Sequence, residues 1–116
     1  MDARVGTGHQ KHLKSMKHAH FLIAYDISSN RHRQRLAKKL LGMGFDRIQF
    51  SVFWGRSYRL RVKELEDWCR HQLPLSQNDN LLIIPLPKRQ MQAAYAQGKS
   101  PEELSDWLNN EGVIFL

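Results

Sequence analysis

The chain has 116 residues, of which 41% are apolar and 25% charged, so it is long enough for one globular domain and too short for two. Its longest apolar run, FLIAY, is too short for a signal sequence or a membrane span, so we expect a soluble, cytoplasmic protein without membrane association. The single cysteine, Cys69, rules out an intramolecular disulfide and fits a reducing compartment.

The formal net charge of +7 is unevenly distributed along the chain. Residues 31–63 hold ten lysines and arginines against one acid, which gives +9, whereas residues 64–116 hold four against eight acids, which gives −4. A strongly basic half indicates a face that binds a polyanion, and nucleic acid is the polyanion that we expect. A solvated charged surface is the alternative interpretation.

Residues 1–19 show no apolar periodicity and are interpreted as a basic leader without regular structure. Four of the six histidines lie in or beside this leader, in H-x-x-H and H-x-H spacings that also fit weak transition-metal binding: His9, His12, His18 and His20.

The next elements alternate between strand and helix signals. Residues 20–27 form a nearly continuous apolar run, which predicts a buried strand. The serines and asparagine at 28–30 are turn and N-cap residues for a helix predicted over 31–41, which Gly42 and Gly44 end. The apolar side of that helix consists of Leu36, Ala37, Leu40, Leu41 and Met43.

Residues 46–54 are rich in β-branched and aromatic side chains and predict either one bent strand or two short strands that meet near Phe50–Ser51. A second helix is predicted over 59–72, and a second wholly apolar strand over 81–86. The order βαββαβ predicts an α+β, ferredoxin-like domain over 20–87, with an antiparallel sheet and two helices on one face.

Residues 88–116 are predicted to form a C-terminal extension. A helical turn is expected over 90–97, before Gly98. The Ser-Pro-Glu-Glu sequence at 100–103 is a capping box that starts a further short helix. The apolar residues 113–116 predict a terminal strand that pairs with this sheet or crosses to a second subunit.

Asp26 ends the first predicted strand and is the only acid between Ala3 and Phe45. A carboxylate there, followed by a run of arginines, fits either a Mg²⁺ ligand that helps to position water and phosphate or a turn carboxylate that caps the next helix. Because Mg²⁺ takes six oxygen ligands, a single carboxylate needs a partner. In a twofold homodimer that partner is Asp26 of the second subunit.

Cations cluster at the start of the first helix, where the free amides and the helix dipole already favour anions. The candidate phosphate-binding residues are Arg31, Arg33, Arg35, Lys38 and Lys39, followed by Arg47, Arg56, Arg59 and Arg61. Phe50, which lies among these cations, is assigned to the core rather than to base stacking. The chain has no P-loop, zinc-finger or RNP1 pattern, and Ser51 has no base partner that makes it a nucleophile.

Four stretches together carry a resemblance to a known family. They are YDIS at Tyr25–Ser28, the arginine-rich first helix, DRIQFSVFWG at Asp46–Gly55 and LLIIPL at 81–86. In this order and spacing, over Phe21–Leu86, they resemble the small CRISPR-associated adaptation nucleases, CRISPR-associated protein two. The DRIQFSVF block with its upstream Tyr-Asp pair is the specific part of the resemblance.

The resemblance implies a ferredoxin-like homodimer in which Asp26 meets its twin near a Mg²⁺ ion. It also implies metal-dependent endonuclease activity on RNA or duplex DNA, and a role in bridging two dimers of the CRISPR integrase during spacer acquisition. By motif match it places catalytic residues at Tyr25, Asp26, Ser51 and Phe53, and further functional residues at Arg33, Arg35 and Arg47.

The chain departs from the family pattern in three places. Trp54 stands where the family often has an acid after Ser-Val-Phe, so an assisting acid is not available there. The leader up to His20 is longer than the family usually needs, and the segment after Leu86 matches only loosely.

The leading functional hypothesis is therefore a homodimeric adaptation subunit that binds duplex DNA and docks the CRISPR integrase. The alternatives are a toxin-like, metal-dependent endoribonuclease and a non-catalytic nucleic-acid-binding protein.

Overall fold

The computed structural model describes residues 17–98. In chain order the elements are β1 (His18–Asp26), α2 (Asn30–Gly42), β2 (Asp46–Gln49), β3 (Val52–Tyr58), α3 (Arg59–Gln72), β4 (Asn80–Pro85) and α4 (Lys88–Gln92). The predicted capping-box helix and terminal strand, and nearly all of the predicted leader, lie outside the described residues. No helix among residues 17–98 is long and apolar enough to cross a membrane.

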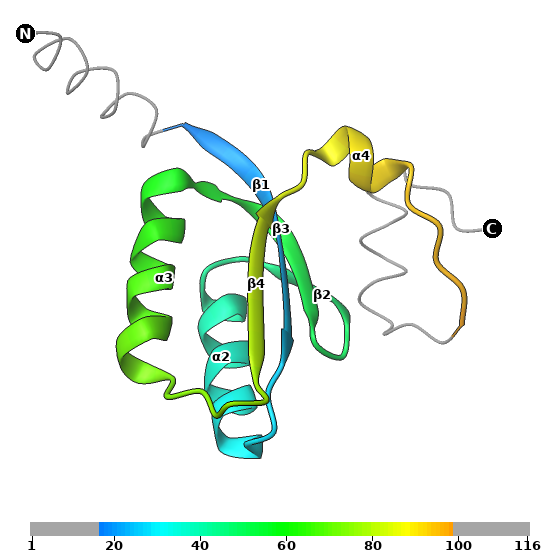
Figure 1. Cartoon of the computed structure of the whole chain (residues 1–116). Coiled ribbons are helices and arrows are strands. Elements are labelled where there is room, and N and C mark those ends of the chain that lie inside the picture. Colours follow the sequence, from blue (N-terminus) through cyan, green and yellow to red (C-terminus); the bar gives the residue numbers. More distant parts are fainter. Residues whose placement is uncertain (1–16, 99–116) are drawn as a thin grey trace, which may run out of the picture.

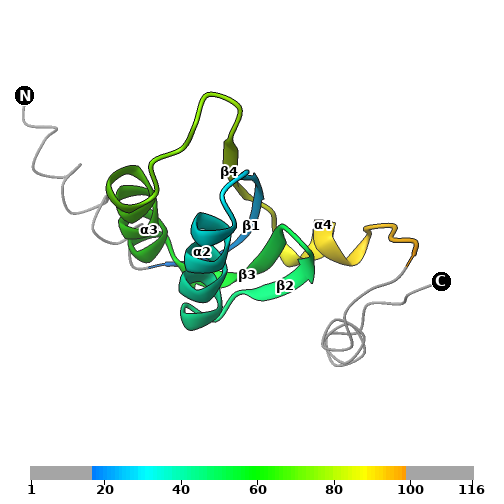
Figure 2. The same cartoon turned by 90° about the horizontal axis from the view of Figure 1, so that it is seen from below.

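The four strands form one sheet in the order β2-β3-β1-β4, and every neighbouring pair is antiparallel. Helices α2 and α3 cover one face of this sheet, whereas the short α4 lies on the opposite side (Figures 1 and 2). Strand β1 is central and pairs with both β3 and β4. This arrangement confirms the predicted α+β, ferredoxin-like fold.

Side chains of β1 alternate between the two faces of the sheet, as the period of a strand requires. One set is buried beneath the helices and comprises Phe21, Ile23 and Tyr25. The other set is directed away from α2 and α3 and comprises Leu22, Ala24 and Asp26. Tyr25 and Asp26 are neighbours in sequence, and the alternation therefore places them on opposite faces.

The ends of α2 follow the predicted signals. Ser29 is the N-cap residue, and its side chain accepts a hydrogen bond of 3.2 Å from the backbone N–H of His32. The helix ends at Gly42, and Gly44 adopts a left-handed φ of 91°, which glycine tolerates without strain. Of the predicted apolar side of α2, Leu36, Ala37 and Leu40 are buried and Met43 is partly buried, whereas the prediction is wrong for Leu41, which is 53% exposed. Helix α3 buries Val62, Leu65 and Cys69.

A second, smaller core lies on the face of the sheet opposite α2 and α3. It consists of Ile48, Trp54 and Met91, so it joins β2, β3 and α4. The indole Nε1 of Trp54 donates a 2.9 Å hydrogen bond to the carbonyl of Leu86, and its ring stacks on His20 at 4.7 Å between centroids. The residue that replaces the family acid is therefore a structural link between β3 and the segment that follows β4.

Strands β2 and β3 meet in a turn at Phe50–Ser51, which confirms the two-strand alternative. The assignment of Phe50 to the core is wrong, because its side chain is 76% exposed. The chain reverses direction at Phe50, which takes the side chain out of the alternation that buries Ile48 and Trp54.

Candidate nucleic-acid interface

Asp26 is exposed at the end of β1, on the sheet face away from α2 and α3. Its partner in the β1–β4 register is Asn80. Because Ser29 caps α2, the alternative that Asp26 caps this helix is wrong. Among residues 17–98 no group of three or more His, Cys, Asp and Glu side chains is placed to hold a metal ion. The Mg²⁺ site at Asp26 therefore stays a prediction, because the described residues offer no larger ligand group around it.

Asp79 links the loop before β4 to the turn after β1. One carboxylate oxygen accepts hydrogen bonds from the backbone N–H and the hydroxyl of Ser28, at 2.9 and 3.0 Å, and the other accepts from the N–H of Ser76 at 2.9 Å. The bonds from the Ser76 and Ser28 amides stabilise the ionised form and lower the pKa of Asp79 to about 2. Sequence reasoning missed this residue, because an acid in a loop gives no signal of a partner 51 positions away.

Arg33, a predicted phosphate ligand, is hydrogen-bonded within the same turn. Its Nη1 donates to the carbonyls of Ile27 and Ser28, at 2.6 and 2.9 Å, and its Nη2 donates to the side-chain oxygen of Asn30 at 3.3 Å. The guanidinium thus fixes the backbone that follows Asp26. Many of the N–H groups of Arg33 already donate hydrogen bonds within the fold. Its role in binding phosphate stays a prediction.

Arg35 also has partners within the chain. Its Nη1 donates a 2.9 Å hydrogen bond to the carbonyl of Gln72 at the end of α3, and its guanidinium lies 5.7 Å from the centroid of the Trp68 ring. Arg31 and Lys38, in contrast, are exposed on α2. A separation of seven residues is about two helical turns, so these two cations share one side of the helix.

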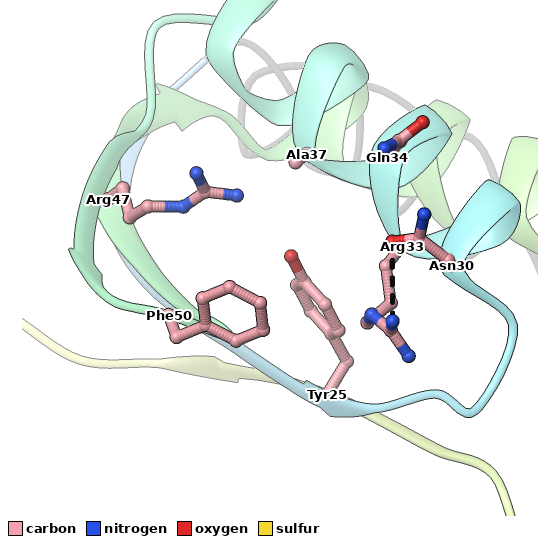
Figure 3. A pocket seen from close by; sticks show the side chains of 7 residues that line it. All are labelled: Tyr25, Asn30, Arg33, Gln34, Ala37, Arg47 and Phe50. Atoms are coloured by element: carbon pink, nitrogen blue, oxygen red, sulfur yellow. Dashed lines mark hydrogen bonds between the residues drawn. The ribbon is translucent and has the colours of Figure 1, made fainter.

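Tyr25, Arg33 and Arg47 meet in a pocket of about 290 Å³ between β1, α2 and the β2–β3 turn (Figure 3). Its other lining residues are Asn30, Gln34, Ala37 and Phe50. No acid lines it, whereas two arginines do. We define these seven residues as the cationic pocket.

Phe53 and Ser51, the other two predicted catalytic residues, contact residues that line the cationic pocket. Phe53 is fully buried, its ring packs 6.2 Å from that of Tyr25, and the guanidinium of Arg47 lies 5.0 Å above it. The carbonyl of Ser51 accepts a 3.1 Å hydrogen bond from the N–H of Tyr25. The structure therefore divides the predicted catalytic set, with Asp26 on one face of the sheet, Tyr25 and Phe53 on the other, and Ser51 in the β2–β3 turn.

The single cysteine does not extend the site. Cys69 is buried against the core, and burial, together with the nearby charge of Glu66, raises the pKa of its thiol to about 11. The thiol stays protonated at neutral pH and is a structural core residue rather than a nucleophile.

The antiparallel βαββαβ sheet, its exposed carboxylate at the end of β1 and its cationic pocket define a basic protein of the ferredoxin-like class. The family model of CRISPR associated protein Cas2 matches residues 19–94. The chain thus belongs to the Cas2 family, as the four motifs predicted.

Individual relatives cover most of the chain. A CRISPR-associated endoribonuclease Cas2 from Aeropyrum pernix is 38% identical over 82 residues, which are 71% of this chain and 88% of the relative. A second protein of that name, from Francisella tularensis subsp. novicida, is 30% identical over 87 residues, or 75% and 88% of the two chains.

Solved structures agree with this assignment. A crystal structure of a Cas2 protein superimposes with a TM-score of 0.58 and 25% identity, covering 74% of this chain and 93% of the other. A hypothetical protein from Thermus thermophilus gives a TM-score of 0.59 and 26% identity, covering 73% and 96%.

Proposed function

We propose that this chain is a homodimeric subunit of CRISPR adaptation that binds duplex DNA, bridges two integrase dimers and carries a Mg²⁺-dependent endonuclease site at Asp26. The observation that carries the proposal is the position of Asp26, exposed at the end of β1 on the sheet face that α2 and α3 leave uncovered. Leu82 on the same face is 52% exposed. A large exposed apolar side chain on the face that also carries an exposed acid suits contact with a second copy of the same surface.

A twofold contact on this face brings two Asp26 carboxylates toward one another. The pair repels unless a cation lies between them, and two carboxylates with phosphate and water oxygens match the ligand preference of Mg²⁺. When bound, the ion supplies charge neutralisation and Lewis-acid activation of a phosphodiester. The contribution of the chain is to hold Asp26 in place, through the hydrogen bonds of Arg33 and Asp79 to the turn that follows it.

Duplex binding is assigned to the basic side of the molecule. Arg31 and Lys38 are exposed on one side of α2, and no acid lies in the first turn of this helix. Contacts of this kind are made to phosphates, so the affinity is independent of sequence and falls steeply with salt.

Asp26→Asn tests the enzymatic part of the proposal. We expect it to abolish Mg²⁺-dependent cleavage and to leave duplex affinity unchanged or slightly higher, because it removes one negative charge and no large side chain. The matched control is Glu64→Gln, which neutralises another exposed acid. Cleavage that survives in Asp26→Asn removes this residue from the mechanism.

Leu82→Glu tests the subunit contact. We expect the variant to be monomeric by light scattering and to lose co-purification with the integrase, because a charge is placed on the contact face. Leu60→Glu is the matched control, since Leu60 is 47% exposed on α3, on the other side of the sheet. A dimer mass that persists in Leu82→Glu would place the contact elsewhere.

RNA cleavage is the second candidate activity, and the names of both curated relatives favour it. Parallel Mg²⁺-dependent assays on single-stranded RNA and duplex DNA, each with the Asp26→Asn control, separate the two substrates.

A further inference from the structure

We propose that the cationic pocket binds the base of an unpaired nucleotide, which stacks on Phe50 and accepts hydrogen bonds from Arg47. The proposal rests on the proposed function and deepens it, because it assigns a second nucleic-acid contact on the sheet face opposite Asp26. It concerns recognition, and no step of cleavage depends on it.

The first observation is the exposure of Phe50. Its side chain is 76% exposed at the β2–β3 turn and forms part of the pocket lining (Figure 3). Covering one face of an exposed phenyl ring removes apolar surface from water, which is favourable. Every nucleotide offers the flat face of its base for this contact. The turn also presents the ring at the mouth of the pocket, where it does not support the core.

The second observation is a pair of polar side chains, Arg47 and Tyr25, that line the pocket. The buried Nε of Arg47 has no hydrogen bond within the part of the chain that the structure describes. The hydroxyl of Tyr25 points toward the same space, between Arg47 and Phe50 (Figure 3). An unpartnered buried donor such as the Arg47 Nε is costly. The guanidinium of Arg47 and the hydroxyl of Tyr25 are both hydrogen-bond donors, and the carbonyl oxygens and ring nitrogens of a base are suitable acceptors for them.

The third observation is the size and position of the pocket. A volume of about 290 Å³ suits one small planar group and excludes a double helix. The bases of a duplex have both faces covered by stacking, so only an unpaired or extruded nucleotide exposes a base to Phe50.

The pocket is also continuous with the basic side of α2. Gln34 lines the pocket and lies three residues after Arg31 and four before Lys38, so all three share one side of the helix. A strand whose phosphates follow Arg31 and Lys38 therefore passes the opening.

The test compares strands that differ only in their bases. Fluorescence anisotropy would measure binding of the full chain to single-stranded DNA, to single-stranded RNA, and to an abasic DNA strand with the same number of phosphates. We expect both base-bearing strands to bind about tenfold more tightly than the abasic strand, the effect expected for one stacked base. A stronger affinity for DNA or for RNA identifies which nucleic acid supplies the nucleotide.

Phe50→Ala should remove this difference and leave the affinity for the abasic strand unchanged, whereas Phe50→Trp should retain it. Tyr95→Ala is the matched control, because Tyr95 is 79% exposed and does not line the pocket. Equal affinity of the unmodified chain for base-bearing and abasic strands, or equal weakening of both by Phe50→Ala, overturns the proposal. Failure to bind duplex DNA overturns the proposed function alone, since the comparison of single strands still decides the pocket.

Discussion

The pair Arg31 and Lys38 gives the sharpest test of duplex binding. The two cations lie seven residues apart on α2, which is about 10 Å along the helix axis. One strand of a duplex advances about 3.4 Å per phosphate, so this distance spans about three phosphates. The perturbation is the double substitution of Arg31 and Lys38 by glutamine, which keeps polar side chains of helical propensity and removes both charges.

The magnitude follows from counterion release. Each phosphate contact contributes about −0.9 to the slope of log K against log salt, so the slope of the double variant should be less negative by about 1.8 for each α2 that contacts DNA. An increase in salt from about 50 to 200 mM should therefore weaken duplex binding by the double variant about 12-fold less than binding by the unmodified chain. Duplex binding measured by anisotropy over that range resolves an effect of this size.

Two controls separate charge from folding. Substitution of Arg70 and Arg89 by glutamine removes the same net charge, from a side chain paired with Asp67 and from α4 on the opposite side of the sheet. Arg31 lies in the first turn of α2, where a cation is disfavoured by about 0.3–1 kcal/mol, so the glutamine variant should unfold at an equal or higher urea concentration. An unchanged salt slope in a folded double variant would refute the assignment of α2 as a phosphate-binding surface.

Three further predictions concern the framework around the sites. Arg33→Met should lower the free energy of unfolding by about 1–3 kcal/mol, because the carbonyl of Ile27 and its neighbours lose a charged donor; an unchanged urea midpoint contradicts this. The pKa of Asp79 is lowered to about 2 in the folded chain, so its stabilisation is complete above its unfolded value near 4 and is lost as pH falls toward 2. Asp79→Asn should flatten the fall in stability over that range, and an identical pH profile would exclude the role of this carboxylate. Gly55→Ala should destabilise by about 1–3 kcal/mol, because a Cβ there lies 2.9 Å from the Cδ1 of Phe45; a neutral result in thermal unfolding means that the Phe45 ring moves aside.

Most of the fold was predictable, because its elements are encoded locally. The apolar run at 20–27, the cap at Ser29 and the break at Gly44 each act within a few residues. The cap and the break lie where the pattern placed them, whereas β1 spans His18–Asp26 and thus begins within the predicted leader. Phe50 was misassigned for the same local reason. An aromatic residue in a β-rich stretch looks like core until the position of the turn is known.

The site was less predictable, because its partners come from distant segments. Arg33 and Arg35 look like free surface cations in the sequence, yet they donate to carbonyls six residues before and 37 residues after them. The cationic pocket is formed by residues of β1, α2, β2 and the β2–β3 turn. No local sequence pattern predicts that these segments lie together. The position of Asp26, in contrast, followed from the end of a single strand.

The adjacency of Tyr25 and Asp26 in β1 has a mechanical consequence. Consecutive Cα atoms are 3.8 Å apart across a rigid peptide plane, so a shift of the strand that moves one side chain moves the other by a similar amount. A ligand that moved the backbone of Tyr25 would therefore also move the carboxylate on the far side of the sheet. Insertion of one residue into β1 before Tyr25 would move the phenol to the face that now carries Asp26 and the acid to the face of the cationic pocket.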